Sequence, residues 1–123
     1  AIVKRWLELE EQKAEWVSAR KSGVHVWELT QEAIRQHYND PESYIYGLET
    51  NRIYRIVCDS DAKGLLKARG GAKKDVARNS LTAEELESVS ALETANRMLM
   101  LMGHDAESRE LDLRKLHASR RGK

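Results

Sequence analysis

The chain has 123 residues, of which 41% are hydrophobic and 33% charged, and its formal net charge at pH 7 is +1. This length suits one domain with a buried core, and the near-neutral charge excludes a whole-molecule attraction to nucleic acid or an anionic membrane. The single cysteine, Cys58, excludes an internal disulfide and a cysteine-cluster metal site. Abundant Ala, Leu, Glu, Lys and Arg, with no Phe and one Pro, favour helix over strand. Because no apolar run approaches about 18 residues and no signal peptide is visible, we expect a cytoplasmic protein.

Residues 2 to about 21 have the periodicity of an amphipathic helix. At about 100° per residue, the apolar side chains share one half of the helical wheel, and they are Ile2, Val3, Trp6, Leu7, Leu9, Ala14, Trp16 and Val17. This arc is wider than a two-stranded coiled-coil seam, so it predicts packing against two neighbours or a second subunit. The predicted interface residues are Ile2, Trp6, Leu9 and Trp16. Gly23 is expected to end the helix as a left-handed cap, and residues 1–22 to continue from an upstream module.

Residues 24–117 are predicted to form one helical domain. The segment 24–27 reads as a short extended turn, after which Thr30 is expected to cap a helix that reaches about Tyr38. Asn39-Asp40-Pro41 then breaks the chain, because the residue before a proline is pushed out of helical geometry. Tyr44 to Gly47 lead into a short helix that starts at Thr50, and another short helix follows and stops at Gly70-Gly71.

The clearest element is a helix over residues 82–102. Thr82 is its predicted N-cap and Glu85 completes a capping box, in which each side chain reaches the backbone N–H of the other residue. The helix stops at Gly103, and Asp105 caps a last helix that frays into a basic tail, residues 118–123. The predicted fold is therefore all-α, a single domain of five to six helices around the long central helix.

Glu93 stands inside the apolar face of this central helix, which carries Leu86, Val89, Leu92, Asn96, Leu99 and Met100. A dry, unpaired carboxylate costs several kcal/mol, so Glu93 must find a base or reach solvent. The candidate bases are Arg52, Arg55 and Arg78.

The patterns that carry catalytic or cofactor chemistry are weak. The segment GLLKARGGAKK lacks both the spacing and the Lys-Ser/Thr of a phosphate-binding loop. The four histidines show no metal-ligand spacing, and Cys58 is expected to be a buried, inert thiol. A hydrolase would need a pocket around Glu93 and His104 with converging polar groups. We therefore expect no catalytic residue, no metal and no cofactor.

Residues 63–78 carry six basic side chains against one acidic side chain, Asp75. Their two short helical stretches around Gly70-Gly71 have the rough size of a helix-turn-helix, so DNA binding is an alternative function. Its candidate phosphate contacts are Lys63, Lys67, Lys73, Lys74 and Arg78. A solvated charged surface is the favoured interpretation of this segment. Tyr44, Tyr46 and Tyr54 are expected to be core aromatics rather than a base-stacking platform.

Three stretches carry a resemblance to a known family: LTQEAIRQHY (29–38), TNRIYRIVCDSDAKGLLKARGG (50–71) and RNSLTAEELESVSALE (78–93), followed by a helix that ends in Gly-His-Asp. Their order resembles the C-terminal domain of phage and mobile-element regulators of the KilA-N, Rha and antirepressor-like kind. Asn79 departs from the aspartate that such proteins tend to carry. The resemblance implies that Arg78, Leu81, Thr82, Glu85 and Glu93 define the fold rather than bind a ligand.

On this resemblance we expect a non-enzymatic regulatory domain of prophage or mobile-element origin. It would act through contact with another protein or through self-association, and a homo-oligomer is expected. The physical interpretation agrees, since Arg78 is predicted to be an internal ion-pair partner and Thr82 and Glu85 to cap a helix.

Overall fold

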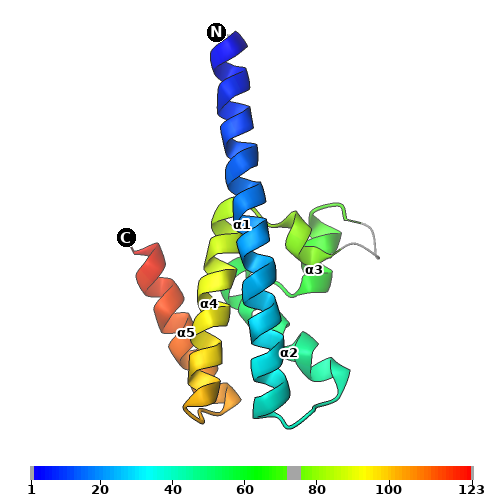
Figure 1. Ribbon diagram of the computed structural model, residues 1–123, viewed down its shortest axis with the longest axis vertical. Coiled ribbons are helices and arrows are strands. Elements are labelled where there is room, and N and C mark those ends of the chain that lie inside the picture. The colour runs from blue at the N-terminus through cyan, green and yellow to red at the C-terminus, as the bar shows by residue number, and fades with distance from the viewer. Residues whose placement is uncertain (1, 72–75, 123) are drawn as a thin grey trace.

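The computed structural model describes residues 2–71 and 76–122, without the side chain of residue 2. Across these ranges the fold consists of five α-helices and one 3-10 helix, with no strand (Figure 1). In chain order they are α1 (Ile2–His37), α2 (Ser43–Cys58), α3 (Ala62–Ala68), η1 (Ala77–Ser80), α4 (Ala83–Leu101) and α5 (Ala106–Arg121). The predicted all-α, single-domain fold is confirmed. The longest helix is α1, however, rather than the segment 82–102.

The helix α4 is the centre of the body, with α1 along one side and α5 along another (Figure 1). α1 and α4 run parallel, because the Trp16 indole donates a hydrogen bond of 2.8 Å to the Leu81 carbonyl just before α4. About two turns further along α1, Gly23 lies against the Ser90 hydroxyl of α4. The apolar core joins α2 to α5 and consists of Ile53, Tyr54, Ile56, Leu65, Ala77, Leu81, Leu86, Val89, Leu92 and Leu113.

α1 continues without a break through Gly23, so the predicted end of a first helix at this glycine is wrong. Gly23 is buried at the contact with α4, and this packing outweighs the cost of about 1 kcal/mol for glycine inside a helix. Thr30 is not an N-cap, because its hydroxyl donates to the Val26 carbonyl four residues earlier in the same helix. The domain boundary expected between residues 22 and 24 therefore does not coincide with any structural break.

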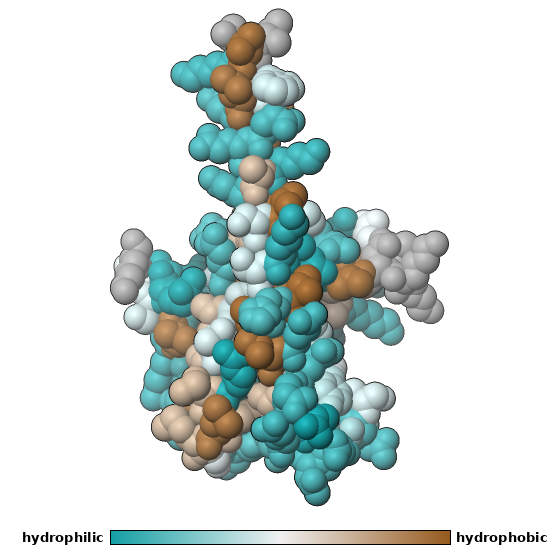
Figure 2. All heavy atoms as spheres, in the orientation of Figure 1, coloured by the Kyte–Doolittle hydropathy of each residue, from teal (hydrophilic) through white to brown (hydrophobic). Residues whose placement is uncertain are grey.

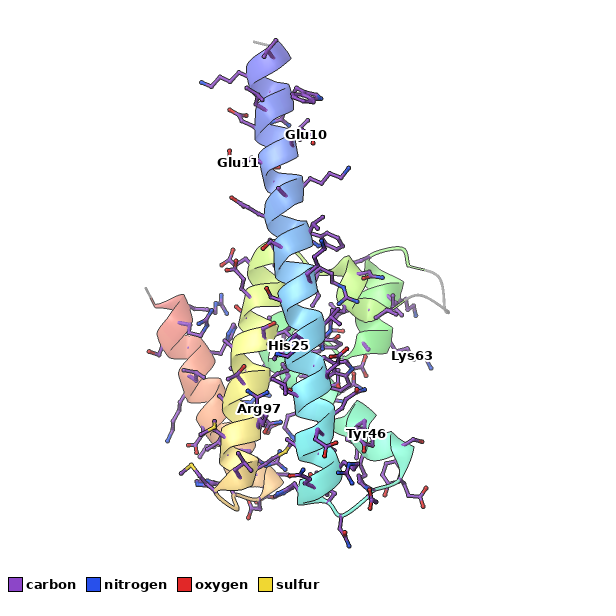
Figure 3. All side chains as sticks on the ribbon, in the orientation of Figure 1. Glu10, Glu11, His25, Tyr46, Lys63 and Arg97 are labelled. Carbon is purple, nitrogen blue, oxygen red and sulfur yellow. The ribbon has the colours of Figure 1, made fainter. Side chains whose placement is uncertain are left out.

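The predicted break after α1 is confirmed. Asn39 and Asp40 have φ angles of 57° and 55°, in the left-handed region, and Pro41 follows them. α2 then begins at Ser43 and passes through Gly47, so the expected start at Thr50 is wrong. Tyr54 lies in the core as predicted, whereas Tyr44 is exposed and Tyr46 is half-buried, so these two are not the predicted core aromatics. Figure 3 labels Tyr46.

Both predicted helix caps in the second half of the chain are confirmed. Thr82 and Glu85 form the capping box of α4, and the Asp105 carboxylate accepts from the Ser108 N–H at the start of α5. α5 reaches Arg121, so residues 118–121 of the expected tail are helical. The predicted helix-turn-helix is not formed by the described residues: after α3 comes only the 3-10 helix η1, while Lys73 and Lys74 lie outside the described ranges.

Candidate protein-interaction site

The first part of α1 stands clear of the body. Every residue from Val3 to Glu15 is exposed, and the helix meets the core only at Trp16, which is half-buried. We call residues 3–15 the projecting segment; at 1.5 Å per residue it is about 20 Å long. Figure 3 shows Glu10 and Glu11 on this segment, above the rest of the molecule. This part of α1 is therefore left uncovered by the other elements that the structure describes.

The projecting segment carries apolar side chains in solvent. Val3 is 71% exposed, Trp6 58%, Leu7 55% and Leu9 48%. Figure 2 shows apolar atoms gathered toward the tip of the helix, among hydrophilic neighbours. A lone helix of this length is marginal in water unless something packs on it, and contiguous exposed apolar groups mark interaction sites. A surface of this kind can bind another apolar helix or an apolar groove by hydrophobic packing.

Two lines of side chains run along this helix. At 100° per residue, Leu9 lies about 20° around α1 from Trp16, toward the face that α1 presents to α4, whereas Trp6 lies about 80° from Trp16. Val3, Leu7, Ala14 and Val17 form a second line, about 100–180° around α1 from Trp16, and Trp6 lies at the edge of this line. Beside Ala14 this second line is hollowed into a shallow depression of about 450 Å³, lined by Glu10, Lys13, Ala14, Val17, Ser18 and Lys21.

The predicted interface residues thus divide into groups. Trp6 and Leu9 are exposed on the projecting segment, as an interface requires. Trp16 is not available to a partner in the predicted way, because its indole packs against the core and bonds Leu81. Of Ile2 only the backbone is described.

Arg78 and Glu93 form the internal ion pair that the sequence predicts. The Arg78 guanidinium donates two hydrogen bonds to the Glu93 carboxylate, at 2.9 and 3.3 Å, and the two side chains are 6% and 1% exposed. The guanidinium also lies over the Trp27 ring, 5.4 Å from its centroid, which ties α1 to η1 and α4. Arg78 is therefore not free to contact DNA phosphates, and this part of the predicted DNA site is wrong.

A second buried polar network escaped the sequence analysis. Arg109 of α5 is fully buried and donates to the Glu49 carboxylate of α2 and to the Asn96 amide of α4, at 2.5 and 2.9 Å. Glu49 also accepts from the Tyr38 hydroxyl and from Arg52. Burial raises the pKa of Glu49, but the hydrogen bonds from Arg109, Asn96 and Tyr38 outweigh burial and hold that pKa at about 2. The network joins the end of α1 to three other helices.

The sequence contains a signal for this network. Glu49 falls in register with the buried Ile53 and Ile56 along α2, as Arg109 does with Leu113 along α5. A charged residue in an apolar stripe demands a partner, the same reasoning that located Glu93. The signal was missed because the helix was expected to begin only at Thr50.

Cys58 is held in its protonated form. Its thiol lies 3.6 Å from a Glu85 carboxylate oxygen, and Arg69 binds the same carboxylate with two hydrogen bonds of 2.7 and 2.9 Å. Burial, followed by the negative charge of Glu85, raises the pKa of Cys58 to about 12. A thiol of this kind is a poor nucleophile at neutral pH, since the reactive species is the thiolate.

Lys63 and Lys67 are the described lysines of the basic segment, and both are exposed one turn apart on α3. Figure 3 labels Lys63. Among the described residues no group of three or more His, Cys, Asp or Glu side chains could hold a metal ion. Glu93 is buried in its pair with Arg78, whereas His104 lies beyond the end of α4 and contacts Ser108 at 3.2 Å. The two residues do not converge on a shared pocket.

Comparison with known proteins adds no family. No protein-family model matches this sequence, and no curated protein sequence matches it. Within residues 2–71 and 76–122, none of the helices has the length and apolar character needed to cross a membrane. The projecting segment is thus identified as the candidate site by its own exposure and chemistry.

Proposed function

We propose that this protein is a non-enzymatic regulatory domain that acts through protein–protein contact at the projecting segment of α1. The observation that carries the proposal is the row of exposed apolar side chains, Val3, Trp6, Leu7 and Leu9, on a helix that its own chain leaves uncovered. The resemblance to phage and mobile-element regulators supplies the proposed setting, a prophage or mobile-element regulator in the cytoplasm.

The polar clusters of the body support a structural rather than a catalytic use. The charges of Arg78, Glu93, Glu49 and Arg109 are directed at one another inside the protein. Each of these charges already has a partner within 3 Å, so it braces the helices instead of facing a substrate. The exposed apolar side chains of the projecting segment, by contrast, pack against none of the described elements of the body, so internal packing does not explain their composition.

The test compares two variants with matched exposure. Trp6→Glu/Leu7→Glu puts charge on the tip, whereas Leu111→Glu changes a side chain of α5 that is 60% exposed, close to the 55% of Leu7. We expect both to fold, as judged by circular dichroism, because neither position is in the core. Only the tip variant should lose self-association in sedimentation or lose capture of a protein from host extract. Identical association and capture by the wild type and both variants would disprove the proposal.

Direct DNA binding stays the alternative, and the exposed pair Lys63 and Lys67 is the observation that favours it. Phosphate contacts of this kind predict a salt-dependent gel shift that weakens in Lys63→Gln/Lys67→Gln. If the shift persists in that variant, α3 is not the binding surface. If the wild type gives a strong shift at physiological salt, DNA binding becomes the leading function.

A further inference from the structure

We propose that the partner of the projecting segment is a second copy of this chain. Residues 3–18 of α1 in the two copies lie antiparallel around a two-fold axis, with Leu7 of each copy packed on Ala14 of the other. This inference rests on the proposed function, since it names the partner of the same surface. A two-fold interface is isologous, so one surface patch supplies both halves of the contact.

The shapes of the two ends of this surface are complementary. Its first half presents Val3 and Leu7, which are 71% and 55% exposed, while its second half presents the small side chains Ala14 and Ser18 over the depression of about 450 Å³. An antiparallel pair places large side chains against small ones at both ends of the contact. A parallel pair would set Leu7 against Leu7 and leave the depression beside Ala14 empty on both copies.

The charged side chains near the two ends of the segment also fit the antiparallel orientation. Lys4 and Arg5 lie at the start of the segment, whereas Glu8, Glu10, Glu11 and Glu15 follow, with Lys13 among them. With Leu7 opposite Ala14, residues whose numbers sum to 21 stand opposite each other, so Glu15 lies two positions from the point opposite Lys4, and Lys13 lies two positions from the point opposite Glu10. Each of these pairs occurs twice by symmetry. In a parallel pair in register, each charged residue would stand at the level of the same residue in the other copy, and like charges held close together cost free energy.

Repulsive contacts remain in the antiparallel pair, because the axis lies midway between Glu10 and Glu11 and these carboxylates of the two copies meet near it. This repulsion and the short overlap limit the affinity. Sixteen residues of helix span about 24 Å, which is small for a stable protein–protein interface, so the dimer is expected to be concentration-dependent.

The body of each copy leaves room for this pairing. At 100° per residue, the line of Val3, Leu7, Ala14 and Val17 lies roughly 130° around α1 from the residues that face α4, such as Trp16, Gly23 and Trp27. The partner helix therefore approaches from the side away from α4. Because the helices are antiparallel, the two bodies lie at opposite ends of the paired region.

Disulfide cross-linking distinguishes the orientations. In a Cys58→Ala background, Leu7→Cys and Ala14→Cys are prepared as separate proteins, and each is oxidised alone and after mixing. In the antiparallel pair Leu7 and Ala14 of different copies are opposite, while two Leu7 positions are offset by about 10 Å along the axis, beyond disulfide reach. We expect a cross-linked dimer from the mixture and little from either protein alone.

Sedimentation of the wild type and of Leu7→Glu completes the test. The variant should weaken dimerisation by about tenfold or more, because the leucine fills the centre of each half of the contact. Efficient cross-linking of Leu7→Cys alone would overturn the antiparallel arrangement but leave the proposed function intact. A wild type that stays monomeric at high micromolar concentration would overturn self-pairing. The proposed function would then stand only if Trp6→Glu/Leu7→Glu abolished the capture of another protein.

Discussion

Replacing Glu49 by Gln removes one charge from the most deeply buried polar network of the protein. The substitution keeps the size and one carbonyl oxygen of the side chain, so the packing of α2 changes little. It leaves the guanidinium of Arg109, which is 0% exposed, without its carboxylate partner at 2.5 Å. The perturbation therefore tests the electrostatic role of Glu49 almost in isolation from its volume.

The structure allows two estimates of the loss. Removing one partner of a buried ion pair typically costs about 3–5 kcal/mol, because the other charge remains uncompensated. The pKa of Glu49 gives a similar value: a fall from 4.5 to about 2 corresponds to about 3 kcal/mol at neutral pH. A domain of this size has a total stability of about 5–15 kcal/mol, so Glu49→Gln should lower the melting temperature by about 10–20 °C.

The assay is urea unfolding followed by circular dichroism, at pH 7 and through the acid range. Because the folded pKa of Glu49 lies below its unfolded value, the stability that the ionised carboxylate contributes is fully present above pH 4.5. It is lost as the pH falls toward about 2. The wild type should therefore lose stability over this window more steeply than Glu49→Gln, and the two curves should approach each other at low pH.

Glu32→Gln is the matched control. Glu32 also pairs with an arginine, Arg35 at 2.5 Å, but both side chains are about half exposed, so water can replace the lost partner. The control should be close to the wild type. If Glu49→Gln lost no more stability than Glu32→Gln, the network would not be the brace that its burial indicates. A partial recovery in Glu49→Gln/Arg109→Met would show that the stranded guanidinium causes the loss.

Three further predictions test separate parts of the fold. Gly23→Ala should stabilise the protein by up to about 1 kcal/mol in thermal unfolding, because alanine favours helix and the new Cβ would meet Ser90 Oγ at 3.5 Å, an ordinary contact. A lower melting temperature would show that the packing between α1 and α4 has no room for the extra methyl group. Asp105→Ala should cost about 1 kcal/mol, since it removes the acceptor of the Ser108 N–H at the start of α5, and Asp105→Asn should recover most of it. Cys58 should react with a disulfide reagent at pH 7 far more slowly in the folded than in the urea-unfolded protein, because its folded pKa is about 12. Equal rates in the two states would contradict the half-buried, protonated thiol.

Features set by a few neighbouring residues could be predicted from the sequence. The capping box of Thr82 and Glu85 and the cap at Asp105 depend on side chains reaching backbone groups within one turn. The partner of Glu93 could also be anticipated, because a carboxylate in an apolar face requires a base. Arg78 was one of three candidates, and only the fold selects among them.

Features decided by tertiary packing could not be predicted. Gly23 has a local preference for ending helices, but burial against α4 keeps it helical. The same holds for Gly47, which α2 passes through on the way to its buried residues. The pair of Glu49 and Arg109 spans 60 positions of sequence, and nothing local shows which distant elements will meet.

The unbroken helix α1 acts as a rigid spacer. Because α1 is a single helix from Ile2 to His37, a partner bound at the projecting segment, as proposed, would be held at a set distance and angle from α2, α3 and α5. Among the described residues of the body, Lys63 and Lys67 of α3 are exposed. Under the proposed function, a partner bound at the projecting segment and a molecule bound at α3 would be held in a relative geometry that α1 sets.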